Sequence, residues 1–270
     1  MSIRLIFDPI KHLPMRVACF MSGSGTNTRK IIEKSARACE YKVVLIFTDI
    51  RDDRLTKSGE KRCRAKDIAE EYNIAYECVD IRDFYLNRGH KTRRDLSIRP
   101  EFDRLVLEKV EPYDIDIIAN AGYMSIMTEP ILWRYSGKIL NVHPADLSIM
   151  EGKERKFVGI HVVEEAILAG EKELRATTHV VRKRVDYGEI LVRSGSIPVH
   201  IPDRVSLKIL KKDKELLKRI VSEHQDRLKE RGDWIIYPLT IQMVAEGRFA
   251  LDGKGNTYLD GKLAPKGFSP

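Results

Sequence analysis

"RVACFMSGSGTNTRKIIEKSARA", residues 16–38, decides the fold of this chain. Its first six residues are an apolar run that predicts a buried strand, and its last twelve have the spacing of a helix. Gly23 and Gly25 make the connection between them a tight turn. The backbone N–H groups of Gly25, Thr26 and Asn27 would hold a phosphate there, because unpaired donors and the helix dipole favour negative charge. We also expect Thr26 or Asn27 to cap the helix.

The same turn matches the dinucleotide-binding pattern G-x-G-x-x-G only in part. Thr28 stands where the third glycine belongs. Asp49 ends the next apolar run and stands where that pattern has an acidic residue, so an NAD(P)-dependent oxidoreductase remains an alternative. A turn that holds a single phosphate is the simpler interpretation.

Apolar runs and amphipathic stretches alternate through the first half of the chain. This alternation predicts an α/β fold with a doubly wound, mostly parallel sheet covered by helices on both faces. We expect strands at residues 16–21, 42–48, 75–79, 114–121 and 138–143. We expect helices at residues 27–38, 63–73 and 101–110. Two charged stretches, residues 82–99 and 148–159, are expected to be surface loops.

The second half has a different pattern. A helix is expected at residues 161–170, and two β-rich stretches, "ATTHVVRKRV" and "GEILVRSGSIPV", meet at the turn signal "DYG". From Asp203, apolar residues recur at three- and four-residue spacing, which predicts one long helix. A further helix follows "GDW", and "NTYLDGKL" predicts a small hairpin.

Composition restricts the class of protein. The 270 residues are 43% hydrophobic, enough for a sizeable core, but no apolar stretch approaches the roughly 20 residues that cross a bilayer. The start of the chain lacks a secretory signal pattern, and the four cysteines lack C-x-x-C spacing. We therefore expect a cytoplasmic protein with reduced thiols, no metal and no membrane partner.

The net charge of +8 suits a field that steers small anionic ligands. The sequence has no zinc-finger spacing and no aromatic RNA-binding signature, so we do not expect a nucleic-acid partner. A non-catalytic module that binds phosphate ligands or nucleic acid remains an alternative, and it rests on the charge alone.

"KILNVHP", residues 138–144, carries the chemistry. Asn141 and His143 point to the same face of a strand because side chains alternate, and Pro144 ends the strand. Ligands of open α/β sheets bind at such strand ends. An amide that stabilises an oxyanion, beside an imidazole that moves a proton, suits a reacting carbonyl. A structural Asn–His pair would explain the same spacing.

Asp186 lies in the "DYG" turn and could reach back to that strand end. A carboxylate beside His143 would raise the pKa of the imidazole and fix its orientation. His179, seven residues before Asp186, would either line the same site or pack as a structural histidine.

The order of several motifs resembles the phosphoribosylglycinamide formyltransferase family, folate-dependent enzymes of purine synthesis. The matching motifs run from about Met15 to Phe268: "MSGSGTN", "IRPEFD", "NAGYMSIM", "YSGKILNVHPADL", "ATTHVVRKRVDYGEIL", "IYPL" and "LDGKLAP". The related methionyl-tRNA formyltransferases and formyltetrahydrofolate deformylases share the Asn–His–Asp centre without the glycine turn. The resemblance implies a Rossmann-like formyltransferase fold.

The resemblance also implies transfer of the formyl group of 10-formyltetrahydrofolate to the amine of glycinamide ribonucleotide. Asn141 would hold the formyl oxygen, His143 would act as the acid, and Asp186 would raise the pKa of His143. No metal takes part in this reaction.

The resemblance assigns binding residues as well. The ribose phosphate would lie on Gly25, Thr26 and Asn27. The folate side would be formed by Arg99, Asn141 and the segment Met124, Ser125, Ile126 and Met127. We expect an N-terminal arm at residues 1–14 and a single domain at 15–270, with a phosphate-binding half at about 15–137 and a catalytic, folate-side half at about 138–270.

This sequence departs from the family pattern at two places. Ser125 stands where the family usually has an arginine, and residues 148–159 replace a leucine- and proline-rich loop with a longer charged one. Glu223 and Asp233 are the candidates for the acidic partner of the acceptor amine. A different amine, such as an amino-sugar nucleotide, or a modified pterin donor is therefore an alternative. We expect a monomer or a homodimer.

Overall fold

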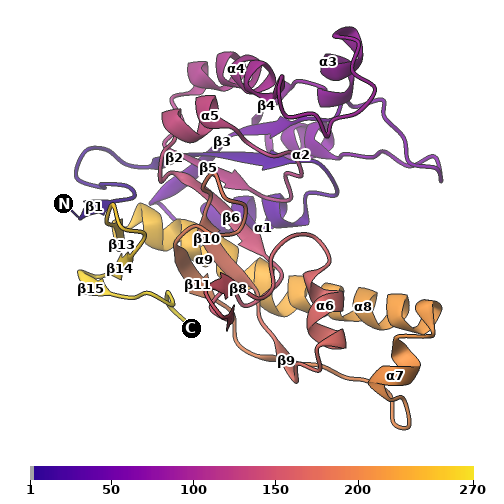
Figure 1. Cartoon of the computed structure of the whole chain (residues 1–270). Helices are drawn as coiled ribbons and strands as arrows, with labels where there is room; N and C mark the ends of the chain where they lie inside the picture. The colour runs from indigo at the N-terminus through magenta and orange to yellow at the C-terminus, as the bar shows by residue number, and fades with distance from the viewer. Residues whose placement is uncertain (1–2) are drawn as a thin grey trace. The chain divides into compact units, whose positions relative to one another are not determined.

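The computed structural model describes residues 3–270 (Figure 1). The chain divides into two compact units. We call residues 5–141 and 241–247 the N-terminal unit. Residues 3–4, 142–240 and 248–270 are the C-terminal unit. Strand β6 crosses from one unit into the other after Asn141.

The N-terminal unit is built on a parallel sheet with the strand order β6-β5-β2-β3-β4. The strands are β2 (Met15–Met21), β3 (Tyr41–Thr48), β4 (Ala75–Cys78), β5 (Ile117–Asn120) and β6 (Ile139–His143). β2 is almost entirely buried, as an apolar run covered on both faces requires. The order reverses between β2 and β5, and ligands bind at such a switch point. This confirms the predicted doubly wound α/β sheet.

Helices follow the strands at nearly all the predicted positions. They are α1 (Thr26–Ser35), α2 (Ala65–Tyr72), α3 (Ile81–Asn87), α4 (Arg99–Val110) and α5 (Glu129–Arg134), with a 3₁₀ turn at Glu111–Tyr113. The loop predicted for residues 82–99 is wrong in its first part, where α3 lies. The Asp80 carboxylate accepts a hydrogen bond from Asp83 N and caps this helix, which buries Phe84 and Tyr85.

The C-terminal unit is richer in β-structure, as predicted. Its helix α6 spans Val162–Leu168, and its strands are β9 (Glu173–Leu174), β10 (Thr177–Val180), β11 (Ile190–Arg193), β12 (Ile197–Pro198), β13 (Phe249–Leu251), β14 (Thr257–Leu259) and β15 (Lys262–Leu263). β10 pairs antiparallel with β11, and β14 with β15, which confirms the predicted hairpin. The two-residue strand β1 (Arg4–Leu5) is the first element of the described residues.

Two expectations for this unit are corrected. Residues 148–159 contain a short antiparallel hairpin, β7 (Met150–Glu151) and β8 (Glu154–Arg155), that turns at Gly152 with φ 64°. The single helix expected from Asp203 is two, α7 (Leu207–Leu210) and α8 (Lys214–Leu228). The side chains of Ser206 and Asp213 each accept a hydrogen bond from the backbone N–H three residues later, so each begins a new helix.

The chain stays helical after α8. A π turn at Lys229–Asp233 leads into α9 (Trp234–Ala245), and Figure 1 shows the two helices following one another in orange and yellow. The helix predicted after "GDW" is therefore confirmed.

Candidate active site

The glycine turn after β2 begins helix α1. Gly25 is the N-cap residue and has φ 73°, a left-handed conformation that favours glycine. A Cβ there would lie 2.4 Å from Ile68 Cδ1 and 2.6 Å from Met21 Cε. Thr26 and Asn27 open the first helical turn, whose N–H groups have no partner within the helix. The turn therefore has the donors that an anion needs.

The expected side-chain cap is wrong. No side chain accepts a hydrogen bond at the start of α1, because glycine occupies the capping position. Among the described residues, the buried Oδ1 of Asn27 has no hydrogen-bond partner. A buried polar atom without a partner is costly, so a ligand or water at this turn would satisfy it.

The segment after β5 is tied to the same turn. Ser22 donates its backbone N–H to Gly122 O (3.0 Å), and Met124 N donates to Ser22 Oγ (3.0 Å). Asp49 accepts from Ser22 Oγ (2.6 Å) and from Ser125 Oγ, and only 1% of it is exposed. Both carboxylate oxygens of Asp49 are therefore engaged within the protein. This opposes the dinucleotide alternative, in which Asp49 would have to face a ribose.

Arg99 holds the 124–127 segment from inside the protein. Its guanidinium is buried and donates to the carbonyls of Ile126 and Arg93 (3.1 Å each) and to Tyr85 Oη (3.2 Å). Arg99 therefore supports the backbone that we expect to bind folate, through Ile126.

One helical turn after Arg99, the carboxylate of Asp103 accepts from the N–H and the hydroxyl of Thr128, both at 2.6 Å. Burial raises the pKa of Asp103. Sequence reasoning missed this residue, although the four-residue spacing of Arg99 and Asp103 in "RPEFD" places both on one face of α4.

In the C-terminal unit, the Asp186 carboxylate lies between two buried imidazoles. Asp186 Oδ2 is 3.7 Å from His143 Nδ1, and Asp186 Oδ1 is 3.6 Å from His179 Nε2. The two rings are nearly perpendicular, with centroids 6.4 Å apart. The structure thus brings together the three residues that the sequence singled out on three different segments. Their chemical roles remain predictions.

Each imidazole also has a backbone partner. His143 Nε2 donates to Phe157 O (3.2 Å), and His179 Nδ1 donates to Val180 O (2.9 Å), since a carbonyl can only accept. His143 therefore has an acceptor at each ring nitrogen, Phe157 O on one side and Asp186 on the other. Two acceptors favour the doubly protonated, positively charged form of the ring, whereas burial disfavours that positive charge.

Two opposing effects set the pKa of His143. Burial lowers the pKa of His143, and this outweighs the opposite effects of the Asp186 charge and of the hydrogen bond to Phe157. Asp186 thus acts in the predicted direction but does not dominate. Burial also lowers the pKa of His179 to about 4, so His179 is neutral at pH 7.

The backbone at Asp186 is strained. Its φ is 59°, in the left-handed region that few side chains other than Asn and Asp adopt. Two residues later, Gly188 packs so closely that a Cβ would lie 1.7 Å from Val180 O. The Asp186 Oδ2 atom accepts a hydrogen bond from Gly159 N (2.9 Å). Sequence reasoning missed Phe157 and Gly159, which lie in a segment expected to be a surface loop.

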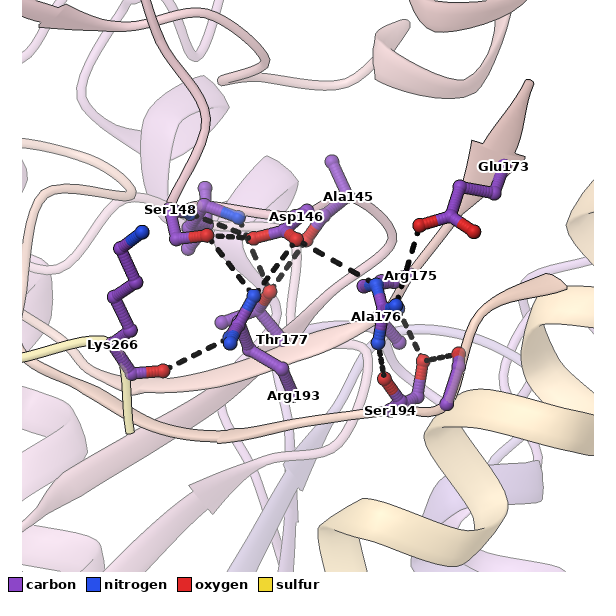
Figure 2. Close-up of polar contacts among 12 residues, drawn as sticks. Ala145, Asp146, Ser148, Glu173, Arg175, Ala176, Thr177, Arg193, Ser194 and Lys266 are labelled. Carbon is purple, nitrogen blue, oxygen red and sulfur yellow. Dashed lines mark hydrogen bonds and ion pairs between the residues drawn. The ribbon is translucent and has the colours of Figure 1, made fainter. Parts of the chain in front are cut away.

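A second cluster fixes the residues that follow His143. Asp146 meets Arg193 at 3.1 Å and Arg175 at 3.9 Å, and Ser148 Oγ donates to the same carboxylate (Figure 2). Thr177 Oγ1 donates to Ala145 O (2.7 Å). These contacts hold the chain after β6 against β10 and β11.

The remaining candidates are placed as follows. Asn141 is half-buried in β6, beside Asn120 of β5, whose buried Oδ1 has no partner among the described residues. Glu223 is exposed on α8, where it lines a cavity of about 320 Å³ with His200 and Arg219. Asp233 is buried in the π turn.

Two properties of residues 3–270 bear on the class of protein. This range contains no group of three or more His, Cys, Asp or Glu side chains that could hold a metal ion. No helix in it has the length and apolar character to cross a membrane.

Comparison with known proteins places the chain in a family. The model of the formyl transferase family matches residues 15–221. The phosphoribosylglycinamide formyltransferase of Haemophilus influenzae is 29% identical over 252 residues, 93% of this chain and 96% of that protein. The phosphoribosylglycinamide formyltransferase of Escherichia coli is 24% identical over 257 residues, 94% of this chain and 99% of that protein. The structure of the Coxiella burnetii phosphoribosylglycinamide formyltransferase is 21% identical and covers 95% of this chain and 99% of its own, with a TM-score of 0.66. The chain therefore belongs to the formyl transferase family.

Proposed function

We propose that this protein transfers a formyl group from 10-formyltetrahydrofolate to the amine of glycinamide ribonucleotide, a step of de novo purine synthesis. The observation that carries the proposal is the buried His143–Asp186 pair, at 3.7 Å, in a chain that also begins α1 at a glycine turn. The full-length relatives that bear this activity in their names support the same substrates.

In the proposed reaction, the acceptor amine attacks the formyl carbon and the carbonyl oxygen takes up negative charge. The Asn141 amide donates a hydrogen bond to that oxygen. His143 supplies a proton to the intermediate, which then collapses, so that the C–N bond to N10 of the folate breaks as the new amide forms. N10 gains the proton that the amine loses, and His143 regains its own.

The proton leaves His143 from Nε2. Nδ1 faces Asp186, whereas Nε2 donates to Phe157 O, a neutral carbonyl that a substrate oxygen can replace. Burial lowers the pKa of His143, whereas the Asp186 charge favours the imidazolium, the form that can give up the Nε2 proton. In this proposal the imidazolium beside Asp186 gives its Nε2 proton to the intermediate and takes a proton back as the intermediate collapses.

We assign the binding roles to the N-terminal unit. The N–H groups of Gly25, Thr26 and Asn27 hold the ribose phosphate. The backbone of Met124–Met127 recognises the pterin, supported by Arg99 through Ile126 O and by Asp49 through Ser125. We propose a cytoplasmic enzyme; whether it is a monomer or a homodimer remains a prediction.

The deciding experiment is a formyl-transfer assay of the purified protein with glycinamide ribonucleotide and 10-formyltetrahydrofolate. We expect multiple turnovers with this pair. Single-turnover transfer to an amino-sugar nucleotide, but not to glycinamide ribonucleotide, would contradict the proposed acceptor.

Two binding measurements distinguish a formyltransferase from an oxidoreductase and from a nucleic-acid-binding module. A rise in melting temperature with NAD(P) but not with a folate analogue would support the oxidoreductase. Oligonucleotide binding that weakens steeply with salt would support the nucleic-acid-binding module.

A further inference from the structure

The segment 148–159, which distinguishes this chain from the family pattern, folds back onto the Asp186 turn. Arg155, at the end of its short hairpin, donates from Nη1 to Asp186 O (2.5 Å) and from Nη2 to Gly188 O (2.9 Å). The backbone N–H of Arg155 also donates to Tyr187 Oη (3.2 Å). One side chain therefore holds both ends of the three-residue turn "DYG".

The same segment touches the reacting groups directly. Gly159 N donates to the Asp186 carboxylate, and Phe157 O accepts from His143 Nε2. Phe157 and Gly159 make these contacts through backbone atoms, whereas Arg155 reaches the Asp186 turn with its side chain. The segment thus forms one wall around these two side chains.

The Asp186 turn needs such support. Asp186 has the left-handed φ of 59°, and a strained conformation of this kind persists only where surrounding contacts hold it. Gly188 allows the turn to approach Val180 O, but it contributes no side chain of its own. The guanidinium of Arg155 is the cation that binds the turn's carbonyls, and its planar fork matches two acceptors at once.

We infer that Arg155 is a positioning residue that fixes the Asp186 carboxylate against His143 by binding the carbonyls of Asp186 and Gly188. The inference rests on the proposed function, and it assigns the inserted segment a part in the same site. The position of the Asp186 carboxylate depends on the conformation of the Asp186 backbone. If Arg155 no longer held the carbonyls of Asp186 and Gly188, the carboxylate could move away from His143.

Arg184 offers a matched control on the same turn. It lies 3.5 Å above the Tyr187 ring and pairs with Glu154, but its side chain is 61% exposed. It has the same chemistry as Arg155 without a contact to the carbonyls of Asp186 or Gly188. An exposed ion pair of this kind contributes little.

The kinetic test compares Arg155→Lys with Arg184→Lys. Lysine keeps the charge and loses the fork, so we expect kcat to fall on the order of 10²-fold in Arg155→Lys, since a shift of about 1 Å has that effect. The KM values should stay within about threefold, because a residue that acts only on the transition state lowers kcat. Arg184→Lys should stay within about twofold in both. An unchanged kcat in folded Arg155→Lys would overturn the inference, as would a rise in KM alone.

A double-mutant cycle tests whether Arg155 acts through Asp186. In the Asp186→Asn background, Arg155→Lys should cause little further loss of kcat, because residues that act as a unit are not additive. A full additional loss would mean that Arg155 works elsewhere.

An NMR titration of the His143 ring separates this inference from the proposed function, because it needs no substrate. The charged and titratable groups around that ring are Asp186, His179 and Arg155. Arg155→Lys should lower the pH at the midpoint of the His143 titration in the wild-type background. In the Asp186→Asn background the same change should leave that midpoint unchanged. An unchanged midpoint in the wild-type background would overturn the inference. Absence of formyl transfer by the wild-type protein would overturn only the proposed function.

Discussion

Two turns of this protein have the same left-handed backbone conformation, and each is accommodated in a different way. At the start of α1 the residue is Gly25, with φ 73°, and at the "DYG" turn it is Asp186, with φ 59°. The first turn presents only backbone N–H groups to a ligand, so it needs no side chain and glycine removes the strain. The second turn exists to present a carboxylate, so glycine cannot serve there.

The difference shows where extra contacts are required. Around Asp186 they come from Arg155, Gly159 and the close approach of Gly188 to Val180. Around Gly25 the neighbours Met21 and Ile68 close the space that a Cβ would fill. A turn that presents only backbone N–H groups needs no more than a glycine at the left-handed position. A turn that presents a side chain from that position depends on contacts with residues elsewhere in the chain.

The largest expected effect comes from removing the charge of the Asp186 turn. Asp186→Asn keeps the size of the side chain and an acceptor for Gly159 N, but it removes the charge that raises the pKa of His143. We expect kcat to fall by roughly 10²–10⁴-fold, the usual contribution of acid–base catalysis. The limb of the pH–rate profile that reports His143 should move to lower pH.

Substrate affinity should be little changed in Asp186→Asn, and exposed Asp203→Asn should behave as wild type. Full activity with an unchanged pH profile would show that the Asp186–His143 pair is structural.

The next effect is at the glycine turn. Gly25→Ala places a side chain at φ 73° and drives its Cβ into Ile68 Cδ1, so the free energy of unfolding should fall by about 1–3 kcal/mol. KM for the phosphate-bearing acceptor should rise more than KM for the folate. Urea unfolding and steady-state kinetics measure the two effects.

Gly23→Ala is the matched control, because nothing lies within 4 Å of its Cβ position. Ile68→Val removes only the clashing Cδ1, so combining it with Gly25→Ala should give less than the sum of the two single effects. Equal losses in Gly23→Ala and Gly25→Ala would contradict the role given to the left-handed conformation.

The sequence was informative at the first turn and incomplete at the second for a physical reason. Apolar runs and a glycine turn are local signals, so β2, α1 and the position of His143 could be predicted. The hairpin around Gly152 has two-residue strands, too short to show a periodicity. The contacts of Arg155 and Asp103 are with partners far away in the chain. The sequence predicts the direction in which Asp186 shifts the pKa of His143, but the larger effect of burial depends on the fold.

The Asp186 region also contains two buried imidazoles, His143 and His179. The pKa of His179 falls from 6.5 in the unfolded chain to about 4 in the folded one. Between these values the unfolded state binds more protons, so stability is present above pH 6.5 and decreases as the pH falls toward 4. The burial of His143 adds an effect of the same sign.

We therefore expect the free energy of unfolding to fall on the order of 2 kcal/mol over this range because of His179. His179→Asn should flatten the dependence measured by urea unfolding at several pH values. The same replacement at exposed His161 should leave the slope as it is. A slope that is unchanged in His179→Asn would show that His179 takes up a proton without cost.

The smallest effect is expected for Ser125→Ala. This variant tests whether folate binding in the N-terminal unit also depends on a side chain. Ser125→Ala removes one of the two hydroxyls that bind Asp49, while Ser22 still holds the other carboxylate oxygen and Met124 N. The 124–127 backbone should loosen, and KM for the folate should rise about three- to tenfold, the equivalent of one ordinary hydrogen bond. KM for the acceptor should not change, because the hydrogen bonds at Gly25 do not involve Ser125. An equal rise in both KM values would mean that Asp49 organises the glycine turn as well, and the contrast between a backbone turn and a side-chain turn would then weaken.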